Sequence, residues 1–186
     1  YTLQSSRGFG PVTTALMGLG NGRVGWGSEH HETFGAYFNR VAALSAICED
    51  LPEHHNTVTL DPELVDSDGI PAPKINYTLG ENSRRMLRHG AERASDVLRE
   101  AGARDIIVQS PLPNAGWHQL GTARMGVDSE DSVVNEWGRS HDVKNLFVVD
   151  GSIFVTSAGV NPTPTIQALA LYIADQIKSR LANLFD

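Results

Sequence analysis

The chain has 186 residues, 40% of them hydrophobic and 20% charged, which is an ordinary globular composition and argues against disorder. Its formal net charge of -7 disfavours a general nucleic-acid binder, because phosphate contacts need a basic surface. No apolar run approaches the roughly 20 residues that cross a bilayer, so we expect no transmembrane segment. Cys48 is the single cysteine, which excludes an internal disulfide and a thiolate metal cluster. That fits a reducing compartment, but cytoplasm and periplasm both remain open.

The first 48 residues are the part of the chain that the sequence assigns least. Residues 1–30 are rich in Gly and Ser around the short apolar segment 12–17, and residues 34–47 are compatible with a strand or with a short helix. A literal G-x-G-x-x-G occurs at 20–25, but a dinucleotide loop also needs a strand before it and a helix opening directly after it. No helical apolar face follows at 26–31, so we interpret these glycines as an ordinary Gly-rich loop.

Two strands and a helix are predicted in the middle of the chain. Residues 57–60 and 74–79 alternate apolar and polar side chains, with turn residues between them, which predicts an antiparallel sheet with one wet face joined by a long loop. A helix capped by Asn82 or Ser83 should run to about Ala101 and end at Gly102. Its expected buried positions are Met86, Leu87, Ala91, Ala94, Val97 and Leu98. A third short strand is predicted at 106–108.

The C-terminal part has a different pattern. The continuous apolar run 146–149 ends at Asp150-Gly151-Ser152, which is typical of a strand buried on both faces, as in a parallel sheet. A final helix should follow. Its apolar positions at helical spacing are Ile166, Leu169, Ala170, Ile173, Ile177 and Leu181. A buried strand followed by a helix is half of a nucleotide-binding unit, and the other half is not visible in the sequence.

Two groups of charged side chains have a plain structural interpretation. The pairs His30-His31 and His54-His55 lack a carboxylate or cysteine that would complete a metal-ligand set, so we interpret them as loop or surface histidines. Arg84, Arg85 and Arg88 form a small basic patch with acidic neighbours in the sequence, and we interpret them as the solvated face of the predicted helix.

His118 and Asn161 are the candidate catalytic residues; taken alone, His118 is equally compatible with a structural histidine, and its pairing with the Asn161 segment favours a catalytic role. His118 follows a loop and precedes a glycine-punctuated segment, where the backbone can approach a ligand closely, and a neutral imidazole can accept a proton near neutral pH. Asn161 should cap the last helix with Pro162 at its first position, or else Thr163 caps and Pro164 begins it. The start of this helix carries partial positive charge, which favours an anionic group nearby. A plain helix cap explains the same residues, and the two interpretations are compatible.

Four blocks in this order resemble the C-terminal signature of the glucose–methanol–choline (GMC) oxidoreductases. They are His118-Gln119-Leu120-Gly121-Thr122-Ala123-Arg124-Met125-Gly126, Ser132-Val133-Val134-Asn135, Asn145-Leu146-Phe147-Val148-Val149-Asp150-Gly151-Ser152 and Asn161-Pro162-Thr163-Pro164-Thr165-Ile166. The region from about Glu49 to Ala182 matches best, and residues 1–48 match loosely. The last block looks closer to sugar and gluconate dehydrogenases and pyranose oxidase than to glucose oxidase.

The resemblance implies an FAD-dependent enzyme that oxidises the CH–OH group of an alcohol or sugar. His118 would accept the hydroxyl proton as hydride leaves for flavin N5, and Asn161 would hydrogen-bond the substrate oxygen. Asp150 and Gly151 would lie near the ribityl and pyrophosphate of FAD, and the helix start at Asn161, Pro162 and Thr163 near the anionic end of the flavin ring. The substrate and the electron acceptor, whether oxygen, a quinone or a cytochrome, are left open.

The implied fold is α+β, with an antiparallel substrate-domain sheet and flanking helices, plus the C-terminal strand and helix of a Rossmann-like FAD-binding domain. Residues 1–116 are then expected to belong to the substrate-binding domain, with 1–48 poorly assigned. Residues 117–186 would be the catalytic loop and the C-terminal segment of the FAD-binding domain. The N-terminal FAD-binding region of the family has no equivalent here, so the chain is expected to be a C-terminal fragment, inactive and colourless by itself.

Two other functions were weighed against this one. A non-catalytic binding or assembly module could keep the same fold, but the presence of both His118 and Asn161 disfavours it. A hydrolase that pairs His118 with a serine and an acid is disfavoured because the chain lacks a G-x-S-x-G nucleophile elbow.

Overall fold

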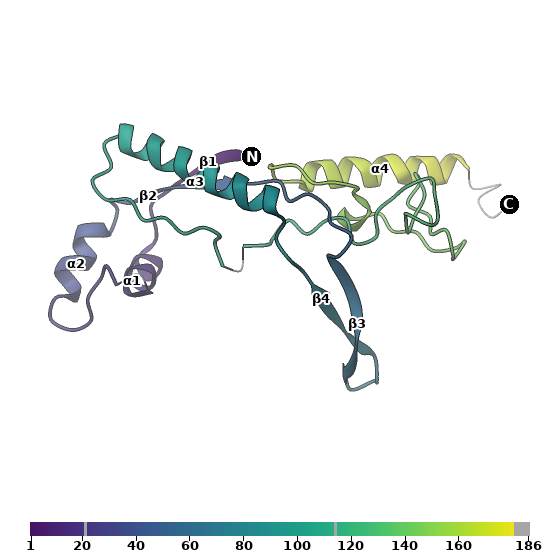
Figure 1. Ribbon diagram of the computed structural model, residues 1–186, viewed down its shortest axis with the longest axis horizontal. Coiled ribbons are helices and arrows are strands. Elements are labelled where there is room, and N and C mark those ends of the chain that lie inside the picture. Colours follow the sequence, from purple (N-terminus) through teal and green to yellow (C-terminus); the bar gives the residue numbers. More distant parts are fainter. Residues whose placement is uncertain (21, 114, 181–186) are drawn as a thin grey trace. The chain divides into compact units, whose positions relative to one another are not determined.

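The computed structural model describes residues 1–20, 22–113 and 115–180, and for residues 17–20 it describes the backbone alone. Figure 1 labels the elements. They are β1 (Thr2–Arg7), α1 (Pro11–Gly20), α2 (His30–Tyr37), β2 (Ala42–Ile47), β3 (Thr57–Val65), β4 (Pro71–Asn76), α3 (Glu81–Glu100), the short 3₁₀ helix η1 (Gly151–Ile153) and α4 (Thr163–Ser179). Mixed helices and small antiparallel sheets agree with the expected α+β class, whereas the FAD-domain part of that expectation stays a prediction.

The chain divides into two compact units. The first unit contains residue 1 and the ranges 48–88 and 109–186, and the second contains residues 2–47 and 89–108. Helix α3 contributes to both units. The expected boundary between residues 116 and 117 divides a substrate-binding part from an FAD-binding part, and it does not coincide with the division into compact units. It stays a prediction.

In the second unit, β1 and β2 pair antiparallel, from Thr2 opposite Ile47 to Arg7 opposite Ala42. The undecided range 34–47 contains both candidate structures, because α2 ends at Tyr37 and β2 begins at Ala42. Helix α1, which ends at Gly20, leads into the glycines at 20–25. A dinucleotide motif requires a strand at this place, so the helix agrees with the interpretation as a Gly-rich loop. The predicted strand at 106–108 was wrong, since these residues pair with no strand among the described residues.

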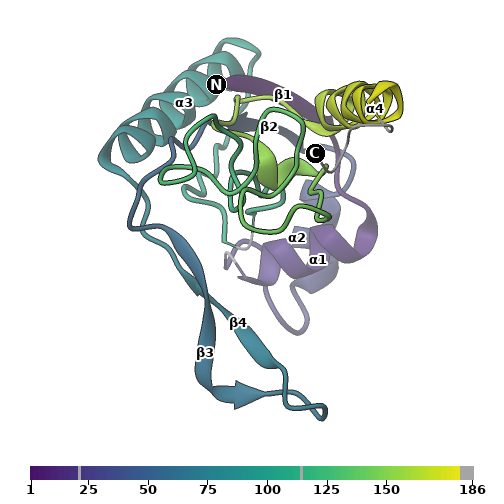
Figure 2. The same cartoon turned by 90° about the vertical axis from the view of Figure 1, so that its right-hand side faces the viewer.

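In the first unit, β3 and β4 form an antiparallel hairpin that can be followed in both views (Figures 1 and 2). This confirms the predicted pair, but β3 extends beyond residue 60, β4 lies three residues earlier than the predicted 74–79, and a short turn replaces the long loop. The Asp66 carboxylate closes that turn by accepting hydrogen bonds from the backbone N–H groups of Asp68 and Ile70, each at 2.9 Å. Local side-chain-to-backbone bonds of this kind are typical of aspartate at turns.

Helix α3 confirms the predicted helix and corrects its cap. It begins at Glu81, so neither Asn82 nor Ser83 is the cap; the Ser83 hydroxyl donates instead to Asp50 at 2.6 Å. At the other end Gly102, with φ +87°, allows the expected glycine termination. Ala94 is buried as predicted, but Val97 is 50% exposed and was assigned wrongly. The arginines at 84, 85 and 88 are exposed, as expected for a solvated face.

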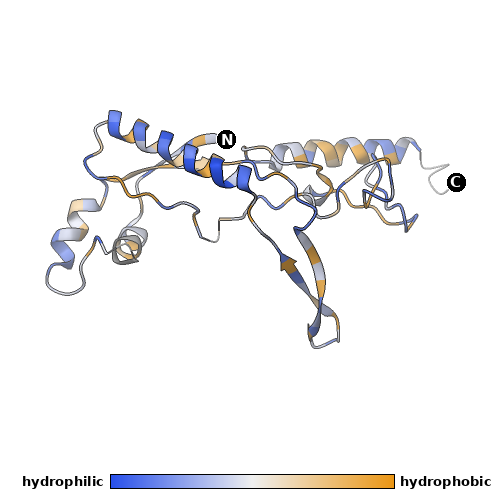
Figure 3. Ribbon diagram, viewed as in Figure 1, coloured by the Kyte–Doolittle hydropathy of each residue, from blue (hydrophilic) through white to orange (hydrophobic). Residues whose placement is uncertain are grey.

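The core of the first unit consists of Val134, Ile153 and Ile173, all fully buried, with partly buried neighbours packed around them. Those neighbours are Met125, Val148, Phe154, Leu169 and Ile177. Helix α4 supplies Ile173 at the predicted spacing, and its more apolar character than that of α3 is visible in Figure 3. The predicted position Leu181 lies outside the described residues.

The predicted buried strand at 146–149 was wrong. Phe147 forms one isolated bridge to Arg139, and Leu146 and Val149 are 48% and 39% exposed. A buried strand of a parallel sheet pairs with neighbouring strands and is covered on both faces, and the described residues provide only this local bridge. The apolar run therefore contributes to the core mainly through Val148. No helix in the described part of the chain is long and apolar enough to cross a membrane.

Candidate active site

Gly151 is the point at which three of the four sequence blocks meet. A Cβ atom at this position would lie 2.6 Å from Leu120 Cδ2 and 3.1 Å from Ile166 Cδ1. Leu120 lies two residues after His118, and Ile166 lies in the first turn of α4, shortly after Asn161. Since no larger residue fits without displacing these side chains, Gly151 is explained by packing between protein segments. Its approach to a cofactor stays a prediction.

Backbone hydrogen bonds fix the His118 block along the turn at 150–153. The N–H groups of Gly121, Ala123 and Met125 donate to the carbonyls of Gly151, Ser152 and Ile153, at 3.2, 2.8 and 2.8 Å. This pairing ends at Met125, which packs against the buried core. The segment that carries His118 is therefore held in register with the segment that carries Asp150.

Asp150 is the N-cap of η1, and its carboxylate accepts a hydrogen bond of 2.8 Å from the backbone N–H of Ser152. The Ser152 hydroxyl first, and this N–H second, hold the pKa of the Asp150 carboxyl below its ordinary value. The side chain is exposed. Asp150 therefore offers an ionised carboxylate that can accept hydrogen bonds from the hydroxyl groups of a ligand.

The start of α4 differs from both predicted caps. Pro162 is the N-cap, Thr163 is the first helical residue, and no side chain caps the helix. Asn161 and Thr163 are exposed, and Pro162 is half-buried. An uncapped helix start leaves N–H groups for an outside acceptor and favours negative charge. That these donors face the anionic part of a flavin stays a prediction.

His118 is exposed on the segment that leads into Leu120. The structure thus brings the segments of His118, Asp150 and Asn161 together at Gly151. That the imidazole and the amide converge on one substrate atom stays a prediction. The histidines at 30–31 and 54–55 belong to no group of potential metal ligands among the described residues, and neither does any other His, Cys, Asp or Glu there.

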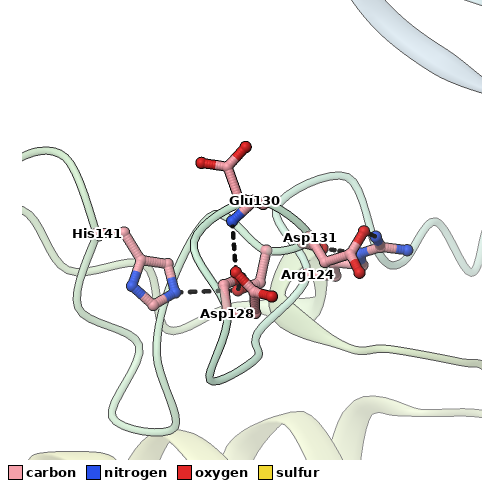
Figure 4. A network of polar contacts seen from close by, with 6 residues as sticks. Arg124, Asp128, Glu130, Asp131 and His141 are labelled. Carbon is pink, nitrogen blue, oxygen red and sulfur yellow. Dashed lines mark hydrogen bonds and ion pairs between the residues drawn. The ribbon is translucent and has the colours of Figure 1, made fainter.

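Sequence reasoning missed a polar network that closes the loop between the first two blocks (Figure 4). Arg124 Nε donates to the Asp131 carbonyl at 2.5 Å, and its guanidinium pairs with the Asp131 carboxylate at 3.3 Å. The His141 Nε2 atom lies 3.0 Å from the Ser132 hydroxyl and 3.2 Å from the Gly126 carbonyl. Arg124 belongs to the first block, and its contacts with Asp131 give it a structural role in fastening this loop.

Two further contacts were also missed, and they reach the segment before Asn161 from far away in the sequence. Thr156 Oγ1 donates to Glu49 Oε1 at 3.0 Å, and Ser157 Oγ donates to the Asp50 carbonyl at 3.4 Å. Each contact joins residues 107 positions apart. No periodicity or motif in the sequence signals a pair at that separation.

The comparisons with known proteins identify the family of the chain. Residues 52–170 match the family model described as GMC oxidoreductase, so the chain belongs to the GMC oxidoreductase family, and it matches the family's C-terminal region. The family consists of flavoproteins in general.

Individual relatives are dehydrogenases and oxidases. The chain is 42% identical to a 2-methyl-1,2-propanediol dehydrogenase of Mycolicibacterium austroafricanum, over all of this chain and 34% of that protein. It is 36% identical to the fructose dehydrogenase large subunit of Gluconobacter japonicus, over 72% of this chain and 24% of that one.

Among solved structures, pyridoxine 4-oxidase from Mesorbium loti is similar with a TM-score of 0.51 and 26% identity, over 70% of this chain and 28% of that one. The chain therefore spans about a third or less of the length of these relatives.

Proposed function

We propose that the natural protein containing this chain oxidises the CH–OH group of an alcohol or sugar to a carbonyl, with His118 as the base and Asn161 as the group that orients the substrate oxygen. One observation carries the proposal: Gly151 joins the segments of both residues around one core. Removing the hydroxyl proton makes the oxygen alkoxide-like and hydride loss from its carbon easier. A positioned base contributes about 10²–10⁴ to such a rate.

FAD would supply the hydride acceptor. Asp150, Gly151, Asn161, Pro162 and Thr163 would hold it: the Asp150 carboxylate as an acceptor for hydroxyl groups, and the start of α4 as a donor to an anionic group. The depressed pKa of Asp150 agrees with its part, because hydrogen bonds from Ser152 stabilise the ionised form that accepts further hydrogen bonds. The other contacts to FAD would come from the N-terminal FAD-binding region of the family.

The substrate class follows from the relatives. Since the relatives include a diol dehydrogenase and a sugar dehydrogenase, we propose a hydroxyl compound of low molecular weight, either a diol or a sugar. A first panel is 2-methyl-1,2-propanediol, fructose and a simple primary alcohol. An artificial redox dye as electron acceptor makes the assay independent of the natural one, whether this is oxygen, a quinone or a cytochrome.

The replacement His118→Ala tests the chemical role. In the flavin-loaded natural protein, turnover should fall by about 10²–10⁴, because the base is lost. Flavin content, measured by visible absorbance, should stay unchanged, because His118 is not among the proposed flavin contacts. His54→Ala is the matched control, since it removes an exposed histidine in a different turn and should leave turnover intact.

The alternative, a non-catalytic binding or assembly module with the GMC fold, predicts a different result. Such a protein would oxidise none of the panel compounds even when fully loaded with flavin. Unchanged turnover in His118→Ala would remove that residue from catalysis, even if the protein proved to be an active dehydrogenase.

A further inference from the structure

The segment that carries Asn161 lacks regular structure. Residues 154–162, which we call the Asn161 loop, connect η1 to α4. Ile153 is fully buried before the loop, and the Pro162 carbonyl accepts a hydrogen bond from Ile166 N–H after it, at 3.0 Å. Both ends are therefore fixed by packing or by the helix. Between these ends, Val155 and Thr156 are exposed, so other contacts are needed to fix the backbone of the loop there.

Glu49 and Asp50 supply such contacts. The Thr156 hydroxyl binds the Glu49 carboxylate, and the Ser157 hydroxyl binds the Asp50 carbonyl. Asp50 is itself held firmly, because each of its carboxylate oxygens accepts a hydroxyl: Tyr77 at 2.5 Å and Ser83 at 2.6 Å. Ser83 is 3% exposed and lies in the first turn of α3. The Asn161 loop is thus attached, through Asp50, to the start of a long helix.

The same contacts exclude the Asp50 carboxylate as a catalytic base. Both carboxylate oxygens are engaged by hydroxyl donors from this chain, so the group is committed to holding protein segments rather than to accepting a substrate proton. Its carbonyl is the atom that faces the Asn161 loop. Any influence on chemistry must therefore pass through the position of the loop.

We infer that Asp50 is a positioning residue for Asn161, acting through the Ser157 hydroxyl, with Glu49 and Thr156 as a second attachment. This inference rests on the proposed function of Asn161. An amide can orient a substrate oxygen only if its own position is defined, and a misplacement of about 1 Å can cost as much as 10²-fold in rate. Loss of the attachment should therefore lower kcat while Asn161 itself is still present.

A double-mutant cycle in the flavin-loaded natural protein tests the inference. Ser157→Ala removes the hydroxyl and should lower kcat roughly tenfold, a fraction of the loss that misplacement can cause. In the Asn161→Ala background the same change should have no further effect, because no amide remains to be positioned. Ser157→Thr keeps a hydroxyl donor and should restore turnover. Ser179→Ala, which removes an exposed hydroxyl at the end of α4, is the matched control and should leave kcat unchanged.

The outcomes separate the two proposals. Equal losses from Ser157→Ala in both backgrounds, or no loss in either, would overturn the positioning role and leave the proposed function standing, provided that Asn161→Ala lowers turnover. Unchanged turnover in Asn161→Ala alone would overturn the positioning role and the proposed role of Asn161, while the oxidation of the substrate and the role of His118 would still stand. Flavin content and thermal midpoint are measured for every variant, and a drop in kcat that follows flavin loss rather than the presence of Asn161 counts against positioning. The cycle uses Ser157 because Asp50→Asn disturbs the buried Ser83 hydroxyl as well.

Discussion

The β3–β4 hairpin and the core around Ile173 are built in opposite ways. The hairpin has regular paired strands, yet its apolar side chains face solvent: Leu60 is 70% exposed and Ile75 68%. The core has only isolated bridges between its segments, yet Ile153 and Ile173 are fully buried. Regular backbone pairing and burial are therefore separate contributions. The family's motif residues lie where packing and backbone hydrogen bonds between loops, rather than paired strands, fix the chain.

Matched truncations give the largest expected difference between these regions. Ile173→Ala should lower the free energy of unfolding by about 2–5 kcal/mol, because it removes buried contacts and leaves a cavity. Ile75→Ala should change it by no more than about 0.5 kcal/mol, because that side chain is already mostly in water. Denaturant unfolding of both variants measures the two changes. Equal losses would mean that the hairpin is as tightly packed as the core.

Glycine replacements give a smaller and more local contrast. Gly138 has φ +68°, and a Cβ there would overlap the Val148 carbonyl oxygen and approach Ile173 Cδ1 to 3.5 Å. Gly69, in the hairpin turn, has φ +79° but nothing within 4 Å of the Cβ position. Gly69→Ala should therefore cost only the left-handed strain of about 1–2 kcal/mol, whereas Gly138→Ala should cost that strain plus a backbone shift, about 2–4 kcal/mol together. Indistinguishable thermal midpoints would contradict this account.

The same comparison explains which elements the sequence predicts. The hairpin and helices α3 and α4 depend on local signals, namely alternation, helical spacing and turn residues, so they were found. The strands predicted at 106–108 and 146–149 were wrong, because an apolar run becomes a strand only when partner strands flank it. Both predicted helix caps were wrong too, since Ser83 turns to Asp50 and α4 has no side-chain cap.

In the candidate site, too, residues in local motifs were predictable and contacts between distant residues were not. Motif blocks identified His118, Asp150, Gly151 and Asn161, and the structure brings their segments together at Gly151. The attachment of Ser157 to Asp50 was not predictable, because it joins residues 107 positions apart through a hydroxyl and a backbone carbonyl. Motifs specify which residues take part in chemistry, while the contacts that hold them depend on the tertiary fold.

The smallest expected effect concerns Tyr77, directly after β4, where the hairpin is fastened to Asp50. Partial burial first, and the hydrogen bond to Asp50 second, raise the pKa of Tyr77 from 10.0 to about 12. The folded protein then holds this proton more tightly than the unfolded chain does. The resulting stabilisation is complete below pH 10, and it is lost as the pH rises through about 12. Denaturant unfolding at a series of alkaline pH values should show this loss, and Tyr77→Phe should make it shallower. An equal decline in Tyr77→Phe would show that the hydroxyl does not fasten the hairpin, which would then be as independent of Asp50 as its exposed side chains suggest.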